Sequence, residues 1–458
     1  MTDAAPRRAG PGFTEGPVAG HVMRLSGFMI LGFLAMTIGQ LIEAVYLGQI
    51  GKAQLAAVAF TFPVTMSLNA IARGIGAGAG ALLAQAAGAD DRAQIVRVTS
   101  HGLTLVVVFT TGLALLAIAL APQIFSLLGA RDGILELTVG YARLWLLAFP
   151  LFAVALAGQG LIRSLGDARY PGLVMSSGPI LQVIVGPFLI FGWLGLPRLE
   201  LTGAALAFAV GAGTQFLLAA AWLFRARVIA LRPERLLASV RDILHVGIPA
   251  AGTNLIQPAS TAVVTVLLAP HGATVVAGFG VASRIEAVVA MVAIGISTSV
   301  VPLVGQNWGA RQFDRVRAAM RFCYLACLAW GLVAACIMWV GAPTFIGWIN
   351  DDAELVDTAA LFLAIVPISI GFMGMLNVAN HCFNAVRRPM PALILSLTRL
   401  LAVYVPLALI GDHFFGFLGI FGAIAAANVL MGIVAWRWNA ATLDSEQAAL
   451  ERQPAAAG

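Results

Sequence analysis

The chain has 458 residues, of which 60% are hydrophobic and only 10% are charged, and its formal net charge is +6. No soluble domain can bury that share of apolar surface, so the composition excludes a soluble globular protein and predicts a polytopic helical membrane protein. The apolar runs are about 20 to 30 residues long, whereas strands of an outer-membrane barrel would be short and alternating.

Charged residues, Pro and Gly divide the sequence into twelve apolar runs, each long enough to cross a bilayer as a helix. The fold class is therefore all-α. The predicted spans are residues 22–48, 54–86, 96–121, 136–162, 170–194, 202–225, 242–269, 275–306, 317–342, 356–384, 390–411 and 417–438.

The cationic side chains predict the orientation. Of the 27 Lys and Arg residues, twenty fall on one side of the twelve-span topology, three on the other and four within spans. By the positive-inside rule, both termini are expected in the cytoplasm. The arginines are scattered over separate loops without interleaved aromatic residues, so they do not indicate a nucleic-acid partner.

Two parts of the chain are similar at a separation of 221 residues. Gly74–Ala89 reads GIGAGAGALLAQAAGA and Gly295–Ala310 reads GISTSVVPLVGQNWGA. Over the longer stretches Val45–Ala89 and Val266–Ala310 there are eleven identities, against about four or five expected by chance. Six spans in each half give both halves the same orientation, so the sequence predicts two six-helix bundles related by a parallel repeat.

The polar segments predict the boundaries between the parts of the chain. We expect a disordered cytoplasmic tail at 1–20, an N-terminal lobe at 21–225, a basic cytoplasmic linker at 226–241, a C-terminal lobe at 242–440 and a cytoplasmic tail at 441–458.

Short motifs follow one another along the chain. They are Glu43–Gly51 (EAVYLGQIG), Ala84–Ala89 (AQAAGA), Arg163–Pro171 (RSLGDARYP), Gly186–Gly192 (GPFLIFG), Leu201–Leu206 (LTGAAL) and Gly305–Ala310 (GQNWGA). Together they resemble the multidrug and toxic compound extrusion (MATE) family of bacteria, and the DinF-like branch more than the NorM-type branch.

The resemblance implies a V-shaped cleft between two six-helix bundles. It also implies antiport by rocker-switch alternating access, in which amphipathic, often cationic, drugs leave the cell while H⁺ or Na⁺ enters. Some family members carry an Asn and an Asp four residues apart on the fifth helix, where this chain has Gln182 and Gly186. The second carboxylate is therefore missing, which favours H⁺ over Na⁺.

Glu43 is the predicted ion-coupling residue, because it is an acidic residue well inside the first six predicted spans. An ionised carboxylate in a bilayer is costly, so such a group faces a cavity, pairs with a cation or takes up a proton. The structural alternative is a fixed salt bridge to the intramembrane Arg73.

Other polar residues within the predicted spans are candidates for the cavity wall, although ordinary hydrogen bonds between helices, worth about 0.6 to 2 kcal/mol each, explain them equally well. Arg284 and Glu286 form a possible second charged site, and a structural ion pair is the alternative. The cavity candidates are Gln40, Asn69, Tyr141, Gln182, Asn254, Gln257 and Thr261.

Several classes of function are not supported. The glycine-rich run Gly74–Gly80 lacks the Lys-Ser/Thr of a phosphate-binding loop, so we expect no use of ATP. The six histidines form no pair with metal-ligand spacing, so we expect neither an enzyme, nor a metal, nor a cofactor. We expect a monomer whose partners are the lipid bilayer and small organic substrates. A flippase for lipid-linked sugars is the alternative function, because Arg73 and Arg284 fit a pyrophosphate.

Overall fold

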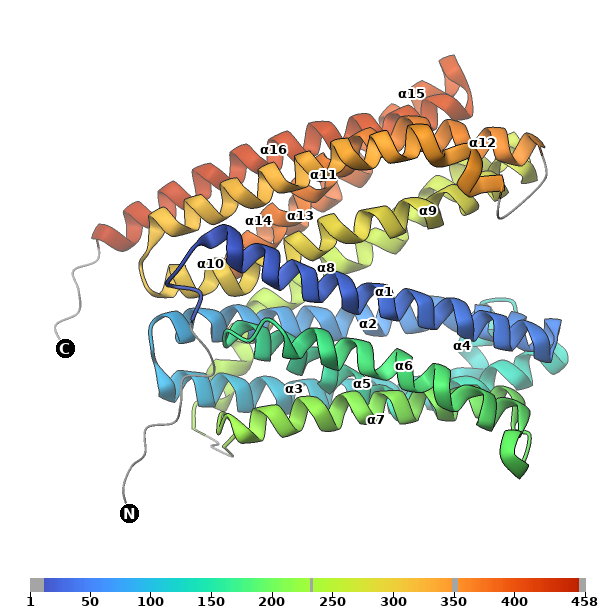
Figure 1. The fold of residues 1–458 in the computed structure, drawn as a ribbon, viewed down its shortest axis with the longest axis horizontal. Helices are drawn as coiled ribbons and strands as arrows, with labels where there is room; N and C mark the ends of the chain where they lie inside the picture. Colours follow the sequence, from blue (N-terminus) through green and yellow to red (C-terminus); the bar gives the residue numbers. More distant parts are fainter. Residues whose placement is uncertain (1–11, 231–233, 348–352, 453–458) are drawn as a thin grey trace. The chain divides into compact units, whose positions relative to one another are not determined.

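The computed structural model describes residues 12–230, 234–347 and 353–452 (Figure 1). Parts of the predicted tails (1–11 and 453–458) and of the predicted linker (231–233) lie outside the described residues. Within the described ranges, twelve segments are long and apolar enough to cross a membrane. This confirms the predicted all-α class and the predicted number of spans.

The chain divides into two compact units. Unit 1 contains residues 27–254, and unit 2 contains residues 16–26 and the chain from Leu255 onward. The division falls inside the long helix α8 (Leu236–Leu268), after the segment 226–241 that the sequence marks as a linker.

Unit 1 is built around the helix α5 (Asp132–Ser164), which packs against α2, α3, α6 and α7. In the apolar 18-residue window of α5, 61% of the residues are buried, a larger share than in any other span of this unit. The other elements of unit 1 are α1 (Val18–Ile50, from residue 27), α2 (Lys52–Gly88), α3 (Arg92–Ala119), α4 (Ala121–Leu127), α6 (Tyr170–Phe191), η1 (Trp193–Gly195), α7 (Glu200–Arg225) and α8 up to Asn254.

Small residues explain why the first part of α8 belongs to unit 1. A Cβ at Gly74 on α2 would lie 2.6 Å from the backbone nitrogen of Ala251, and a Cβ at Gly78 would overlap the carbonyl oxygen of Ile243. The two backbones touch only because these positions lack side chains, as expected for close helix packing. The glycine-rich run therefore has a packing role.

Unit 2 has a similar centre, formed by α12 and α13 with the short 3₁₀ turn η3 between them. In the apolar 18-residue stretch of this span, 61% of the residues are buried, as in α5. The elements of unit 2 are the end of α8, η2 (Ala269–His271), α9 (Ala273–Thr298), α10 (Val300–Gly309), α11 (Phe313–Gly347), α12 (Ala353–Ile365), η3 (Val366–Ser369), α13 (Ile370–Ala385), α14 (Met390–Leu397), the π-helix η4 (Thr398–Tyr404), α15 (Val405–Phe415) and α16 (Phe417–Arg452).

The helix boundaries reproduce the internal repeat. Adding 221 to the bounds of α2 gives 273–309, which are the bounds of the span formed by α9 and α10. Adding 221 to the bounds of α5 gives 353–385, which is where α12 begins and α13 ends. The repeat that the sequence shows over one helix pair thus extends to the backbone of the central helices.

Candidate ion-coupling site

A proline in α6 leaves a backbone carbonyl free next to Glu43. Pro187 has no N–H, so it cannot donate to the carbonyl of Val183, four residues earlier in the helix. The hydroxyl of Tyr46 on α1 donates to this carbonyl instead, at 3.4 Å. A buried carbonyl needs a partner, so this bond fixes α1 against α6 at the level of the candidate site.

A second carbonyl of α6, two turns earlier and also left without its helical donor by a proline, holds α6 against α7. Pro179 cannot donate to the carbonyl of Met175, and the side-chain amide of Gln215 on α7 donates to it at 3.0 Å. Gly178 makes room for Gln215, because a Cβ at this position would lie 2.5 Å from the amide nitrogen. Two prolines therefore position the part of α6 that carries Gln182.

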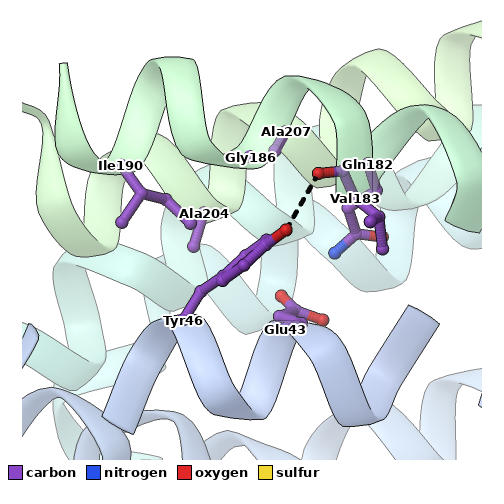
Figure 2. A pocket seen from close by; sticks show the side chains of 8 residues that line it. All are labelled: Glu43, Tyr46, Gln182, Val183, Gly186, Ile190, Ala204 and Ala207. Atoms are coloured by element: carbon purple, nitrogen blue, oxygen red, sulfur yellow. Dashed lines mark hydrogen bonds between the residues drawn. The ribbon is translucent and has the colours of Figure 1, made fainter. Parts of the chain in front are cut away.

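Glu43 and Gln182 line a small cavity between α1, α6 and α7 (Figure 2). Its volume is about 10 Å³, which is close to the minimum needed for one water molecule. Apart from Glu43, Tyr46 and Gln182, the cavity is lined by Val183, Gly186, Ile190, Ala204 and Ala207. The space suits a proton or a single water, and is far too small for an organic substrate.

The Glu43 carboxyl has neutral partners. The side chain of Gln182 is a hydrogen-bond partner of Glu43. The buried Tyr141 on α5 is close enough to interact with it electrostatically. Across the part of the chain that the structure describes, Glu43 has no ion-pair partner, so the salt bridge to Arg73 that the sequence left open is not formed.

Tyr46 occupies the place of the missing second carboxylate. A Cβ at Gly186 would lie 3.3 Å from the ring of Tyr46, so the aromatic ring packs directly on the glycine backbone. The ring also makes an edge contact with Phe191, with the centroids 5.9 Å apart. Gly186, the position where the resemblance implies that a second carboxylate is missing, is thus closed by an aromatic ring.

The remaining candidates for the cavity wall do not join this cluster. Gln40 is exposed on α1, and Asn69 on α2 donates its amide to a carbonyl of its own helix at 2.8 Å. Asn254, Gln257 and Thr261 are exposed on α8, and the first belongs to unit 1 while the other two belong to unit 2. Of the predicted wall residues, the structure places Tyr141 and Gln182 beside Glu43.

In unit 2, Glu286 on α9 has a cation beside it. Arg399, which lies in the π-helix η4, is within electrostatic range of Glu286. Its guanidinium donates to Oδ1 of Asn428 at 3.1 Å and to Oγ of Ser260 at 3.2 Å. Arg284, in contrast, is exposed on α9, and among the described residues neither arginine forms an ion pair with Glu286.

Tyr46 and Arg399 are the residues whose role sequence reasoning missed. A signal for Tyr46 existed, because Pro187 identifies Val183 as a carbonyl in need of a donor. Arg399 and Glu286 are more than one hundred positions apart in the sequence, so no local pattern predicts that they come within electrostatic range of each other.

The family of the chain follows from comparison with known proteins. The MatE family model matches residues 29–188 and 249–410. This chain belongs to the MATE family. The members are transporters, and the match confirms the resemblance that the motifs show, while the DinF-like branch stays a prediction.

Three relatives that match over most of their length have names of two kinds, one for transport of FAD and two for multidrug resistance or export. The "FAD transporter" of Shewanella oneidensis is 30% identical over 93% of this chain and 95% of its own length. The "Probable multidrug resistance protein YoeA" of Bacillus subtilis is 24% identical over 84% of this chain and 85% of its own. The "Multidrug export protein MepA" of Staphylococcus aureus is 22% identical over 92% of this chain and 94% of its own.

Solved MATE structures share the fold. A crystal structure of a mutant of the Vibrio cholerae MATE transporter VcmN superimposes with a TM-score of 0.89 at 26% identity, covering 93% of this chain and 97% of that chain. The same transporter in its bent form gives a TM-score of 0.88 over 94% of this chain and 98% of that chain, also at 26% identity.

Proposed function

We propose that this MATE-family chain is a secondary active antiporter, which exports amphipathic organic compounds in exchange for protons by rocker-switch alternating access of its two units. Glu43 is the proton-coupling residue in this proposal. The chain works as a monomer in a bacterial inner membrane, with both termini in the cytoplasm, and needs no cofactor.

The observation that carries the proposal is the surroundings of Glu43. This carboxyl contacts an amide and a small cavity, and no cation forms an ion pair with it within the described ranges. A carboxyl with neutral partners can gain and lose a proton without breaking a buried ion pair, which would cost about 3–5 kcal/mol. It therefore has the property that a coupling site requires.

The cavity favours a proton over a metal cation. Hard cations bind several oxygen ligands at once. The cavity offers one carboxylate, and most of its wall is apolar or glycine (Val183, Gly186, Ile190, Ala204 and Ala207). Na⁺ coupling, which other members of the family use, therefore has weaker support here.

The test uses the purified chain in sealed liposomes, with a gradient of pH or of Na⁺ imposed separately. Transport of ethidium and of FAD is followed by their fluorescence. We expect transport with the pH gradient alone and none with the Na⁺ gradient at clamped pH. Transport that requires Na⁺ at clamped pH, or transport that proceeds equally without any gradient, would contradict the proposal.

A further inference from the structure

Unit 1 contains two arginines that the proton site does not use. Arg73 on α2 and Arg163 on α5 are both half-buried, and they are close enough to repel each other. Within the ranges that the structure describes, neither has an ion-pair partner. Among the described residues, no carboxylate therefore lies within ion-pair distance of these two arginines.

α2 packs closely on α5 just after Arg73 and next to Arg163. A Cβ at Gly76 would lie 3.5 Å from the Cα of Ala157, and one at Gly80 would lie 3.3 Å from the hydroxyl of Ser164. The two helices therefore run side by side at this level with no large side chain between them.

Some of the hydrogen-bond donors of Arg163 have a weak acceptor or none. Its Nη1 faces the sulfur of Met29 on α1 at 3.2 Å, and thioether sulfur is a weak acceptor. Its Nε is buried and has no hydrogen-bond partner. A buried donor without a partner costs about 1–3 kcal/mol, and more when it is charged, so this guanidinium is poised for an acceptor.

The surroundings of Arg73 are amphipathic. Phe62, Met66, Asn69 and Arg73 follow one another at intervals of three or four residues, so they share one face of α2. Phe62 is 59% and Met66 is 40% exposed, while Oδ1 of Asn69 is buried without a partner. Along α2 from Phe62 to Arg73, this face is therefore apolar at its beginning and polar and positively charged at its end.

We propose that Arg73 and Arg163 bind the phosphate or pyrophosphate group of an amphipathic anionic substrate. An arginine stays charged inside a protein, so two half-buried guanidinium groups that form no ion pair among the described residues favour an anionic ligand. Guanidinium groups match phosphate oxygens in pairs, and the exposed Phe62 and Met66 fit a planar apolar ring on the same ligand. This proposal deepens the proposed export function and rests on it for transport, although not for binding.

The phosphate site and the proton site are separate. Met29, which contacts Arg163, and Glu43 lie on the same helix α1 about 21 Å apart along its axis, from the rise of 1.5 Å per residue. Substitutions at one site should therefore leave the other intact, which allows the two proposals to fail independently.

The experiment measures binding of FAD and of inorganic pyrophosphate to the full chain in nanodiscs of zwitterionic lipid, by calorimetry. The relative from Shewanella oneidensis makes FAD a suitable probe, and riboflavin provides the same ring without phosphate. We expect Arg73→Gln and Arg163→Gln each to weaken binding of FAD at least about tenfold, and not to change binding of riboflavin. Arg143→Gln, on the exposed side of α5, is the matched control and should leave binding of FAD unchanged.

The variants Arg73→Lys and Arg163→Lys keep the charge and show whether loss of binding reflects loss of folding. We expect them to retain part of the affinity for pyrophosphate. A second arm replaces the zwitterionic lipid by phosphatidylglycerol. If FAD does not bind but phosphatidylglycerol stays with the purified protein only when both arginines are present, the phosphate belongs to a lipid headgroup, and the site is still confirmed.

The proposal is overturned if the binding of FAD, of pyrophosphate and of phosphatidylglycerol is the same with and without Arg73 and Arg163. Glu43→Gln separates this outcome from failure of the proposed function. If it stops proton-driven transport while FAD binds normally, both proposals hold. If transport continues in Glu43→Gln, the coupling proposal fails and the phosphate site is unaffected.

Discussion

Each unit has a carboxyl well inside a spanning helix, Glu43 on α1 and Glu286 on α9, and the two have different neighbours. Glu43 in unit 1 lies beside the amide of Gln182 and a cavity of about 10 Å³. Glu286 in unit 2 lies within range of Arg399, which Asn428 and Ser260 hold in place. A nearby cation favours the charged form of a carboxyl, and within the described residues no cation forms an ion pair with Glu43.

The repeat preserves the helices and changes the charges. At the separation of 221 residues, Glu43 corresponds to Val264, which is buried, and Glu286 corresponds to Thr65, whose hydroxyl donates to the carbonyl of Phe62 at 3.0 Å. Arg73 and Arg163 correspond to Ile294 and Asn384. One backbone plan thus carries a carboxyl with neutral partners in one copy and a carboxyl within electrostatic range of an arginine in the other.

The largest difference between the two carboxyls is expected in transport. Glu43→Gln keeps the size and the hydrogen bonding of the side chain and removes the exchangeable proton, so export should fall to the level of cells that lack the transporter. Glu286→Gln should keep most of the activity. The measurement is ethidium efflux from cells, with the amount of each variant in the membrane determined by immunoblot. Equal loss in both variants would remove the distinction between the units.

The stability of unit 2 should depend strongly on Arg399. Arg399→Ala removes the cation within range of Glu286 and the hydrogen bonds to Asn428 and Ser260, so it should cost about 1–3 kcal/mol. Adding Glu286→Gln removes the orphaned charge, so the double variant should recover part of this loss. Thermal unfolding in detergent tests both. If the double variant is as unstable as Arg399→Ala, the guanidinium acts through Asn428 and Ser260 alone.

A substitution on α2 tests whether the first part of α8 belongs to unit 1. A side chain at Gly78 meets the backbone of Ile243, so Gly78→Val should destabilise the protein by about 1–3 kcal/mol through overpacking. The control is Gly140→Val on α5, where a Cβ meets no atom within 4 Å. Both valines sit inside helices and carry the same propensity cost, so equal effects in the two variants would show that the contact with α8 is unimportant.

The smallest expected effect concerns Tyr46. Tyr46→Phe removes the donor to the carbonyl of Val183 and should cost about 1 kcal/mol of unfolding free energy. Adding Pro187→Ala restores a backbone N–H that can bond this carbonyl within α6, so it should stabilise the Tyr46→Phe variant more than the wild type. A double-mutant cycle by thermal unfolding measures this coupling, and additive effects would show that the hydroxyl has another partner.

The sequence predicted the spans because the apolar part of each helix is a continuous run of hydrophobic residues in the sequence. It was less accurate where helices continue beyond that part. The predicted span at 242–269 corresponds to a helix that begins at Leu236, and the last helix continues to Arg452, well past residue 438. There, polar contacts such as that between Gln447 and Glu451, at 2.6 Å, replace apolar burial as the support of the helix.

The candidate site was only partly predictable. Glu43 and Gln182 are visible in the sequence, because one is a charge in an apolar run and the other stands at a position that the resemblance to the family singles out. The nearness of Tyr141 to Glu43, and of Arg399 to Glu286, depends on how distant helices pack. The same applies to Arg163, which the sequence places simply among the cytoplasmic arginines, whereas the structure sets it beside Arg73.

The central claim is that Glu43 exchanges a proton and Glu286 does not, and infrared spectroscopy tests it most directly. Difference spectra of the purified protein between acidic and alkaline pH show the carbonyl stretch of any buried carboxyl that becomes protonated. We expect such a band in the wild type and in Glu286→Gln, and its loss in Glu43→Gln. A band that persists in Glu43→Gln and disappears in Glu286→Gln would contradict the account and assign proton coupling to unit 2.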